Sequence, residues 1–276
     1  MTVAEDRLAF TGSNGAALTG DLYRPSGPGH HPVMVAVPGG AWLRGDKAQL
    51  SAWGRYLAAQ GIAVFAIDYT RSTNGPAFPD NVQDVGAATR FLSQQSDTLG
   101  LDRARFGLFG ASAGAHLAAL AALRQDPEDD DAVAFKTLVA VYGVYDLVSH
   151  WQADLDKNAT RGADPTERMM GCTPFDDQAA FFLASPLRQI TYGRNSLKTL
   201  LIWGDADRDV LPAQSEAFAR ALRQAGFFVR TQSVPGAGHF WFSEEAPGEP
   251  GSFSATVAPL LLKFLKQHLS DDRTRQ

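Results

Sequence analysis

The stretch of sequence that decides the fold is Phe106-Gly107-Leu108-Phe109-Gly110-Ala111-Ser112-Ala113-Gly114. Its first half ends an apolar run at 104–109, of the kind that a strand buried on both faces requires. Its second half fits the pattern G-x-S-x-G, and an Ala- and Leu-rich segment of helical character extends to residue 124. The stretch therefore predicts a buried strand, a tight turn that carries Ser112, and a helix, in that order.

The same alternation of strand and helix continues on both sides of this stretch. Apolar runs predict buried strands at 33–37, 62–67, 104–109, 138–142, 200–203 and 228–234. Helical segments are predicted at 47–59, 81–95, 113–124, 213–225 and 253–268. Two strand-like runs near the start, 7–11 and 17–23, flank a Gly-Ser-Asn-Gly turn and predict a β-meander. Together they predict an α/β fold whose mostly parallel central sheet has helices on both faces.

The alternation fails between residues 143 and 196. This segment holds aromatic residues and methionines among prolines, glycines and charged residues. A structureless loop of about 50 residues is unusual inside a compact domain. We therefore expect a small helical cap at 143–196, inserted after the fourth core strand and lying over the site, within a single domain that spans 1–276.

Composition limits the classes of function. The chain has 276 residues, 45% of them hydrophobic, which is enough to bury the core of one large domain. It has 25 Lys and Arg residues against 30 Asp and Glu, so clustered contacts to the phosphates of a nucleic acid are not expected. No apolar run approaches the roughly 20 residues that cross a bilayer, and the acidic start predicts no signal peptide. We expect a cytoplasmic protein with no membrane contact, and a solvated loop at the acidic run 128–131.

Ser112 has the setting of a catalytic nucleophile. A nucleophilic serine stands on a tight turn between strand and helix, where flanking side chains would collide with neighbouring backbone, and this explains Gly110 and Gly114. Its hydroxyl then projects at the carboxyl edge of the sheet, next to a helix N-terminus that stabilises negative charge. The alternative is an Ala- and Gly-rich turn with a capping serine, but the strand and helix on either side favour the nucleophile.

A second small-residue turn, Val37-Pro38-Gly39-Gly40-Ala41-Trp42, follows the first buried strand. In an acyl-transfer enzyme of this architecture, this is the place of the loop that binds the oxyanion of a tetrahedral intermediate. We predict that the backbone N–H groups of Gly40 and Ala41, with that of Ala113 after the nucleophile, form the oxyanion hole. By itself the turn would be an ordinary Pro-Gly-Gly turn.

His239 is the favoured general base. It lies in Pro235-Gly236-Ala237-Gly238-His239-Phe240, a glycine-rich loop after the last predicted strand, where a side chain can reach the serine and still move a proton. His116 lies on the helix one turn after Ser112, where a packed or hydrogen-bonded role is expected. His150 lies in the cap and is an alternative contact for a substrate.

The acid that orients the histidine is expected in Trp203-Gly204-Asp205-Ala206-Asp207-Arg208-Asp209-Val210, after the fifth strand. Three carboxylates compete there. Asp207 is favoured, and Asp205 and Asp209 are alternatives whose ordinary role would be to structure the loop. The chain order Ser, Asp, His is the one that this architecture uses.

With these residues the chain resembles the α/β-hydrolase superfamily, and within it the small esterases and lipase-like enzymes related to hormone-sensitive lipase. The resemblance extends from about residue 21 to 269 and includes Gly45-Asp46-Lys47, Asp68-Tyr69 and the residues that follow Ser112. It implies the α/β-hydrolase fold and a structural acid at Asp84, which we expect to pair with Arg71 or another basic neighbour. One departure is clear: the usual His-Gly-Gly-Gly is Pro38-Gly39-Gly40-Ala41, so the imidazole that normally braces the oxyanion loop is missing.

The predicted function is hydrolysis of small-molecule carboxylic esters by a serine hydrolase, with no metal and no organic cofactor. Four aromatic residues are candidates for the wall of the substrate pocket or for plain core packing: Trp42, Trp151, Phe240 and Trp241. Two alternatives stay open, an amide-cleaving relative such as an arylformamidase or small peptidase, and a ligand-binding module without catalysis. Small esterases of this kind often form homodimers. Cys172 is favoured as a buried apolar residue over a surface thiol.

Overall fold

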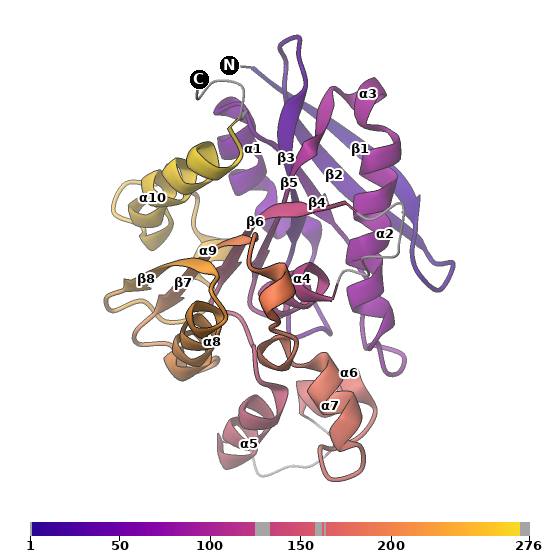
Figure 1. Cartoon of the computed structure of the whole chain (residues 1–276), viewed down its shortest axis with the longest axis vertical. Helices are drawn as coiled ribbons and strands as arrows, with labels where there is room; N and C mark the ends of the chain where they lie inside the picture. Colours follow the sequence, from indigo (N-terminus) through magenta and orange to yellow (C-terminus); the bar gives the residue numbers. More distant parts are fainter. Residues whose placement is uncertain (1, 125–132, 158–161, 163, 271–276) are drawn as a thin grey trace.

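The computed structural model describes residues 2–124, 133–157, 162 and 164–270, so the acidic run 128–131 lies outside the described residues. Within this part of the chain the centre is an eight-stranded sheet of order β1-β2-β4-β3-β5-β6-β7-β8 (Figure 1). The strands are β1 (Val3–Thr11), β2 (Ala17–Pro25), β3 (His31–Val37), β4 (Ala63–Ile67), β5 (Leu101–Ala111), β6 (Phe135–Val141), β7 (Lys198–Gly204) and β8 (Phe228–Val234). β2 pairs antiparallel with β1 and β4, and all other pairs are parallel, which confirms the predicted mostly parallel sheet.

Helices cover both faces of this sheet. Outside the segment between β6 and β7 they are η1 (Lys47–Leu50), α1 (Ser51–Ala59), α2 (Asp80–Gln94), α3 (Ser96–Leu99), α4 (Ala113–Leu123), α8 (Pro212–Gln224), α9 (Trp241–Glu244) and α10 (Phe253–His268). Parallel crossovers are right-handed, so α1, whose crossover returns from β3 to β4, lies on one face, and α2, α4 and α8 lie on the other. α10 packs on α9, whose Phe242 stacks on Trp53 of α1, with 4.3 Å between ring centroids.

Several elements differ from the sequence prediction, among them β1 and the first helix. β1 begins at Val3 rather than at residue 7, because this edge strand is largely exposed and lacks the apolar residues by which a buried strand is recognised. The helix predicted at 47–59 is a 3₁₀ turn, η1, followed by α1. Asp46 caps η1, since its carboxylate accepts a hydrogen bond from the Ala48 N–H at 2.7 Å.

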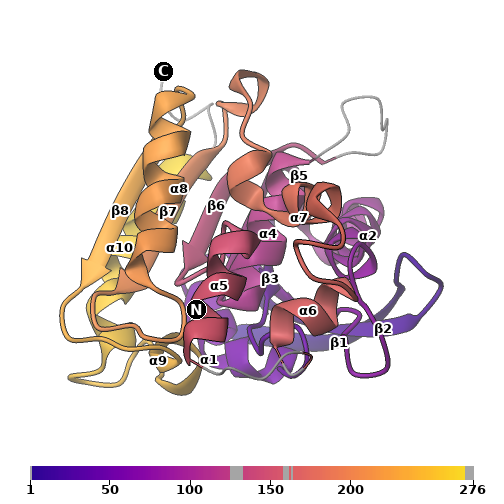
Figure 2. The same cartoon turned by 90° about the horizontal axis from the view of Figure 1, so that it is seen from below.

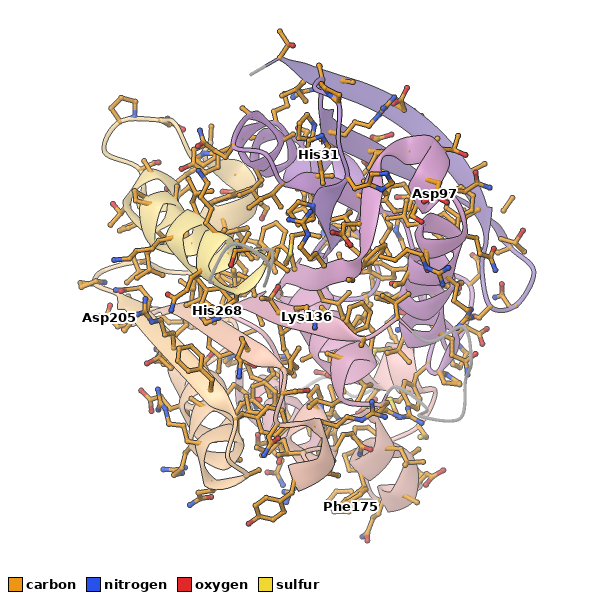
Figure 3. The ribbon with its side chains drawn as sticks, turned by 45° about the horizontal axis from the view of Figure 1, so that its top comes forward. His31, Asp97, Lys136, Phe175, Asp205 and His268 are labelled. Carbon is orange, nitrogen blue, oxygen red and sulfur yellow. The ribbon has the colours of Figure 1, made fainter. Side chains whose placement is uncertain are left out.

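The described residues of the segment between β6 and β7 form five short helices: α5 (Leu147–Lys157), α6 (Pro165–Met170), α7 (Gln178–Ala184), η2 (Pro186–Arg188) and η3 (Tyr192–Arg194). Three of them, α5, α6 and α7, gather at one end of the molecule (Figures 1 and 2). Figure 3 shows Phe175 of this segment and His31, at the start of β3, at opposite ends. We call the segment the cap, and its limits at 143 and 196 stay a prediction.

Hydrogen bonds tie the cap to the rest of the chain. The Met169 carbonyl accepts from the N–H groups of Ala77 and Phe78, at 2.9 and 3.2 Å. On the other side, the Gln214 side chain of α8 accepts from the N–H groups of Tyr145 and Asp146, both at 2.8 Å. These contacts hold the cap near the ends of the strands.

Strand register brings the connections that follow five parallel strands to one edge of the sheet. Val37, the last residue of β3, is paired with Gly110 of β5, and Ala111 of β5 is paired with Val141, the last residue of β6. Gly204 of β7 is paired with Val234 of β8. Because parallel strands end at the same edge, the loops that follow them meet there.

Candidate active site

Ser112 occupies a strained turn between β5 and α4. Its φ of 54° lies in the left-handed region that residues other than glycine avoid, and such a conformation costs about 1–3 kcal/mol. A Cβ at Gly110 would collide with the Gly114 carbonyl, and a Cβ at Gly114 would collide with that of Val37. The Ser112 N–H donates to the Val141 carbonyl at 2.9 Å, which ties the turn to the end of β6.

His239 and Asp207 form a hydrogen-bonded chain with this serine. His239 Nε2 lies 2.9 Å from Ser112 Oγ, and His239 Nδ1 lies 2.7 Å from Asp207 Oδ2. The histidine and aspartate side chains are 3% and 0% exposed, so bulk water does not compete for these bonds. With its Nδ1 proton held by the carboxylate, the imidazole presents Nε2 as an acceptor for the serine hydroxyl.

The three carboxylates of the loop after β7 make different contacts. Asp207 faces His239, and its other oxygen accepts from the N–H groups of Asp209 and Val210, at 2.9 and 3.0 Å. Asp205, labelled in Figure 3, accepts from the Gly236 N–H at 2.7 Å and so holds the loop of the histidine. Asp209 is exposed, and within the described part of the chain His239 Nδ1 bonds to Asp207 and not to Asp209.

The loop after β3 has a run of left-handed residues. Gly40, Ala41 and Trp42 have φ values of 120°, 52° and 58°. The Gly40 carbonyl accepts from the N–H groups of Leu43 and Arg44, at 3.1 and 2.8 Å, which closes a tight turn.

Three backbone donors of this region are available to a ligand. Among the described residues, no hydrogen-bond partner is found for the N–H groups of Gly40, Ala41 and Ala113. Ala113 is the first residue of α4, and an N–H in a first helical turn has no partner within the helix. All three residues line the cavity that also contains Ser112 and His239. Such an arrangement can stabilise an oxyanion formed at the serine.

The sequence motifs after this loop form a charged brace. Lys47 Nζ lies 2.6 Å from Asp68 Oδ2, and Arg71 Nη2 lies 3.1 Å from Asp68 Oδ1. The Tyr69 hydroxyl donates to the Pro38 carbonyl at 3.3 Å. Motifs that are 20 or more residues apart in the chain therefore join the oxyanion loop to the end of β4.

The expected pairing of Asp84 with Arg71 is wrong. Asp84 is fully buried and accepts three short hydrogen bonds, from the Ser13 N–H and hydroxyl at 2.8 and 3.0 Å and from the Thr70 N–H at 2.8 Å. Arg71 binds Asp68 instead. The carboxylate orders backbone turns, a role that a short sequence pattern cannot distinguish from an ion pair.

The cavity at Ser112 has a volume of about 690 Å³. Trp42 and Phe240 line it, and Phe240 is 49% exposed with its ring edge-on to His239. His150 and Asp154 reach it from α5 of the cap, with 3.4 Å between His150 Nε2 and Asp154 Oδ2. His150 is buried, and this burial lowers the pKa of its imidazole.

Two of the four aromatic candidates do not line this cavity. Trp151 is buried inside the cap, where its indole N–H donates to Glu167 at 2.8 Å. Trp241 is buried against Tyr142, with ring centroids 5.7 Å apart. Trp241 belongs to the hydrophobic core, whereas Trp151 packs edge to face on Phe175 of the cap, with 5.6 Å between the ring centroids.

Tyr142 is a site residue that the sequence did not reveal. It follows β6 with a φ of 38°, is buried, and packs its ring on the imidazole of His239, with 4.3 Å between the centroids. This contact limits the ring positions open to His239. No local pattern marks it, since the two residues are joined only by the order of strands in the sheet.

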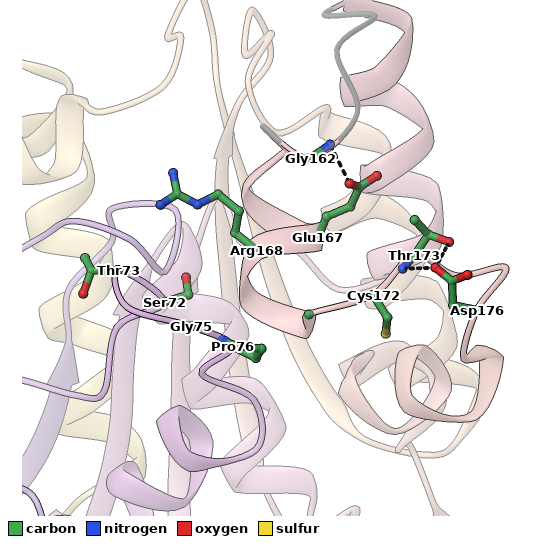
Figure 4. Close-up of a pocket in the computed structure, with 11 residues that line it drawn as sticks. Ser72, Thr73, Gly75, Pro76, Gly162, Glu167, Arg168, Cys172, Thr173 and Asp176 are labelled. Atoms are coloured by element: carbon green, nitrogen blue, oxygen red, sulfur yellow. Dashed lines mark hydrogen bonds between the residues drawn. The ribbon is translucent and has the colours of Figure 1, made fainter.

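A second opening of about 530 Å³ lies between the loop after β4 and the cap (Figure 4). Ser72 and Pro76 line one side, and Arg168 and Cys172 line the other. Cys172 was favoured as a buried residue, which is wrong: it is half-buried at the rim of this opening, after the turn that ends α6. Partial burial raises the pKa of its thiol.

Comparison with known sequences identifies relatives. The family model described as BD-FAE matches residues 20–222, most of the chain. Esterase LipC of Mycobacterium tuberculosis is 34% identical over 223 residues, which are 75% of this chain and 52% of that protein. A probable isoprenylcysteine alpha-carbonyl methylesterase of Oryza sativa is 30% identical over 223 residues, 75% of this chain and 50% of that protein. The chain spans about half the length of these curated relatives.

Solved structures with the same fold include carboxyl esterase 2 from Tuber melanosporum and a bacterial heroin esterase. The first has a TM-score of 0.76 at 24% identity and covers 97% of this chain and 88% of its own. The second has a TM-score of 0.79 at 22% identity and covers 98% of this chain and 85% of its own. Among the described residues, no helix is both long and apolar enough to cross a membrane. The predicted α/β-hydrolase fold is confirmed, and with a family model matched over residues 20–222 the chain belongs to the BD-FAE family.

Proposed function

We propose that this chain hydrolyses carboxylic esters through a Ser112–His239–Asp207 triad and an acyl-enzyme intermediate. The observation that carries the proposal is the hydrogen-bonded chain of the three side chains, with 2.9 Å from serine to histidine and 2.7 Å from histidine to aspartate. The names of the relatives, an esterase and a methylesterase, support an ester as the bond that is cleaved.

In the acylation step His239 accepts the hydroxyl proton of Ser112 as the Oγ atom attacks the ester carbonyl carbon. The carbonyl oxygen becomes negatively charged and accepts hydrogen bonds from the N–H groups of Gly40, Ala41 and Ala113. Removing one such donor costs roughly 3 kcal/mol in comparable enzymes. The C–O bond to the alcohol then breaks, and His239 passes its proton to the departing oxygen.

Deacylation repeats these steps with water. His239 accepts a proton from a water molecule, whose oxygen attacks the acyl carbon, and the same three N–H groups hold the second oxyanion. The bond to Ser112 breaks, the serine recovers its proton from His239, and the carboxylic acid leaves. Asp207 holds the imidazole in the required tautomer throughout and stabilises its protonated form.

The cavity supports small esters with a polar part. It is lined by apolar side chains such as Trp42 and Phe240 and by polar ones such as His150, Asp154 and Gln49. A volume of about 690 Å³ accepts a small molecule as a whole, in the range typical of ligand sites. We therefore expect a preference for short acyl groups over long alkyl chains.

The test is turnover of a series of 4-nitrophenyl esters, from acetate to dodecanoate, by the wild type, Ser112→Ala and Ser26→Ala. Ser26 is exposed in the loop after β2 and serves as a matched control. We expect hydrolysis that is fastest for short acyl groups, unchanged in Ser26→Ala and lost in Ser112→Ala. A fluorophosphonate should label the wild type once, on a peptide that contains Ser112.

Other outcomes would contradict the proposal in distinct ways. Activity that survives in folded Ser112→Ala would exclude this serine as the nucleophile. Turnover of formanilides or peptidyl amides, with none of esters, would establish the amide-cleaving alternative. Absence of both fluorophosphonate labelling and turnover of either class would leave the non-catalytic binding module.

A further inference from the structure

Trp42 and His116 form a buried hydrogen bond behind the oxyanion loop. The indole Nε1–H of Trp42 donates to His116 Nδ1 at 3.0 Å, and the two rings meet edge to face with 5.2 Å between centroids. Both side chains are almost completely shielded from water. Trp42 follows Ala41 directly, so a fixed indole limits the conformations of the backbone that carries the proposed oxyanion donors.

The second nitrogen of His116 reaches the cap. His116 Nε2 lies 2.7 Å from the carbonyl oxygen of Ala184, the last residue of α7. An indole N–H can only donate, so Nδ1 must accept, and the proton of the neutral imidazole lies on Nε2, which donates to Ala184. Burial lowers the pKa of His116 to about 4, so the ring stays in this neutral form at neutral pH.

The main chain of Trp42 is held as well. Its carbonyl oxygen accepts from the Ser72 N–H at 2.9 Å and from the Ser72 hydroxyl at 3.2 Å, and Ser72 is labelled in Figure 4. Left-handed backbone at a residue other than glycine persists only where the surroundings determine it strongly. Trp42 has a φ of 58°, and its hydrogen bonds with His116 and Ser72 hold it in this conformation.

A brace is needed here because Pro38 replaces the first histidine of the His-Gly-Gly-Gly pattern. Proline has no imidazole, and the Pro38 carbonyl accepts a long hydrogen bond from the Tyr69 hydroxyl, at 3.3 Å. His116 lies on α4 and reaches the loop through the indole of Trp42. The same imidazole binds the oxyanion loop and the cap at once.

We propose that His116 is the positioning residue of the oxyanion loop, acting through the indole of Trp42 and joining the loop to the cap at Ala184. This inference rests on the proposed function, since it assigns the loop a role in the transition state. His116 touches no substrate and moves no proton. Its effect is to keep the N–H groups of Gly40 and Ala41 where the oxyanion forms.

The test compares kcat, KM and thermal unfolding of Trp42→Phe, His116→Leu, His116→Asn and the double variant Trp42→Phe/His116→Leu. Trp53→Phe is the matched control, because the Trp53 indole is also buried and donates to the Phe242 carbonyl at 2.9 Å, on the other face of the sheet. Rates are divided by the concentration of sites that a fluorophosphonate labels, so that a partly unfolded sample does not count as a slow enzyme.

We expect kcat to fall about tenfold or more in Trp42→Phe and in His116→Leu, with KM changed little, because a displaced donor loses its effect on the transition state. The double variant should be no slower than the worse single variant, since both remove the same bond. His116→Asn, whose side-chain oxygen can accept from the indole, should recover most of kcat. Trp53→Phe should lower the unfolding temperature and leave kcat unchanged.

The inference is overturned if folded His116→Leu keeps kcat within about twofold of the wild type, or if the two single effects multiply in the double variant. A loss of kcat in Trp53→Phe equal to that in Trp42→Phe would also overturn it, since general loosening would then explain both. These results are separate from the proposed function, which depends on Ser112→Ala alone.

Discussion

The edge of the sheet and the cap both line the cavity at Ser112, but they do so by different physical means. The sheet supplies backbone: N–H groups of Gly40, Ala41 and Ala113, on turns whose positions follow from strand register. The cap supplies side chains, such as His150 and Asp154 of α5, which are held by packing and by a few hydrogen bonds. The difference suggests that changes at the sheet edge alter the rate of the chemical step, whereas changes in the cap alter which substrate is preferred.

The most severe test of this comparison is His239→Ala. Loss of the proposed general base should reduce kcat by about 10⁴- to 10⁶-fold, and the combination with Ser112→Ala should be no worse, because triad members act as a unit. Single-turnover and steady-state rates with 4-nitrophenyl acetate measure this. His31, a half-buried histidine at the start of β3, provides the control, and His31→Ala should retain the wild-type rate.

The next test concerns the three carboxylates after β7. Asp207→Asn should lower kcat by about 10⁴-fold, because an amide at this position no longer favours the required tautomer of His239. Asp209→Asn should have little effect, and Asp205→Asn should act only through the loop that it holds at Gly236. A kcat of Asp209→Asn as low as that of Asp207→Asn would show that the wrong acid is assigned.

Gly40→Ala tests the backbone part of the site. Its φ of 120° disfavours a side chain, and a Cβ there would collide with the Arg44 carbonyl, so the turn must move. We expect kcat to fall about 100-fold, as when one oxyanion donor is lost. Gly29→Ala is the matched control, because Gly29 has a φ of 123° but open space around it. In Gly29→Ala the strained backbone should lower the unfolding temperature, as in Gly40→Ala, but kcat should stay at the wild-type value.

The smallest effect is expected in the cap. His150→Asn should change the ratio of kcat/KM between acetate and butyrate esters by about 10-fold or less, as is typical of a pocket contact. Trp151→Phe, which loses only the bond to Glu167 inside the cap, should leave this ratio unchanged and lower the unfolding temperature. Equal ratios in wild type and His150→Asn would place the acyl group outside the reach of the cap.

The parts of the site that the sequence predicts are those in which neighbouring residues in the chain act together. Gly110 to Gly114 form one turn, and their chemistry requires them to be adjacent. The strand pattern around them predicted the sheet because a strand buried on both faces must be apolar throughout. The loops at 38–42 and 205–209 were located by the same logic, since each follows a buried strand.

Tertiary structure decided the contacts between residues that are distant in the chain. Only strand order and helix packing bring Tyr142 onto the ring of His239, and only they join Trp42 to His116, 74 positions later. The cap illustrates the limit most clearly. Its helices are short, and α7 leaves Phe182 and Leu183 exposed, so the pattern at 143–196 predicts an insertion but not which of its side chains are buried. Trp151 is buried and donates to Glu167, whereas its neighbour His150 lines the cavity. Sequence specifies local backbone through sterics and hydrogen bonding, whereas the direction of a side chain in a packed insertion depends on every surface that it meets.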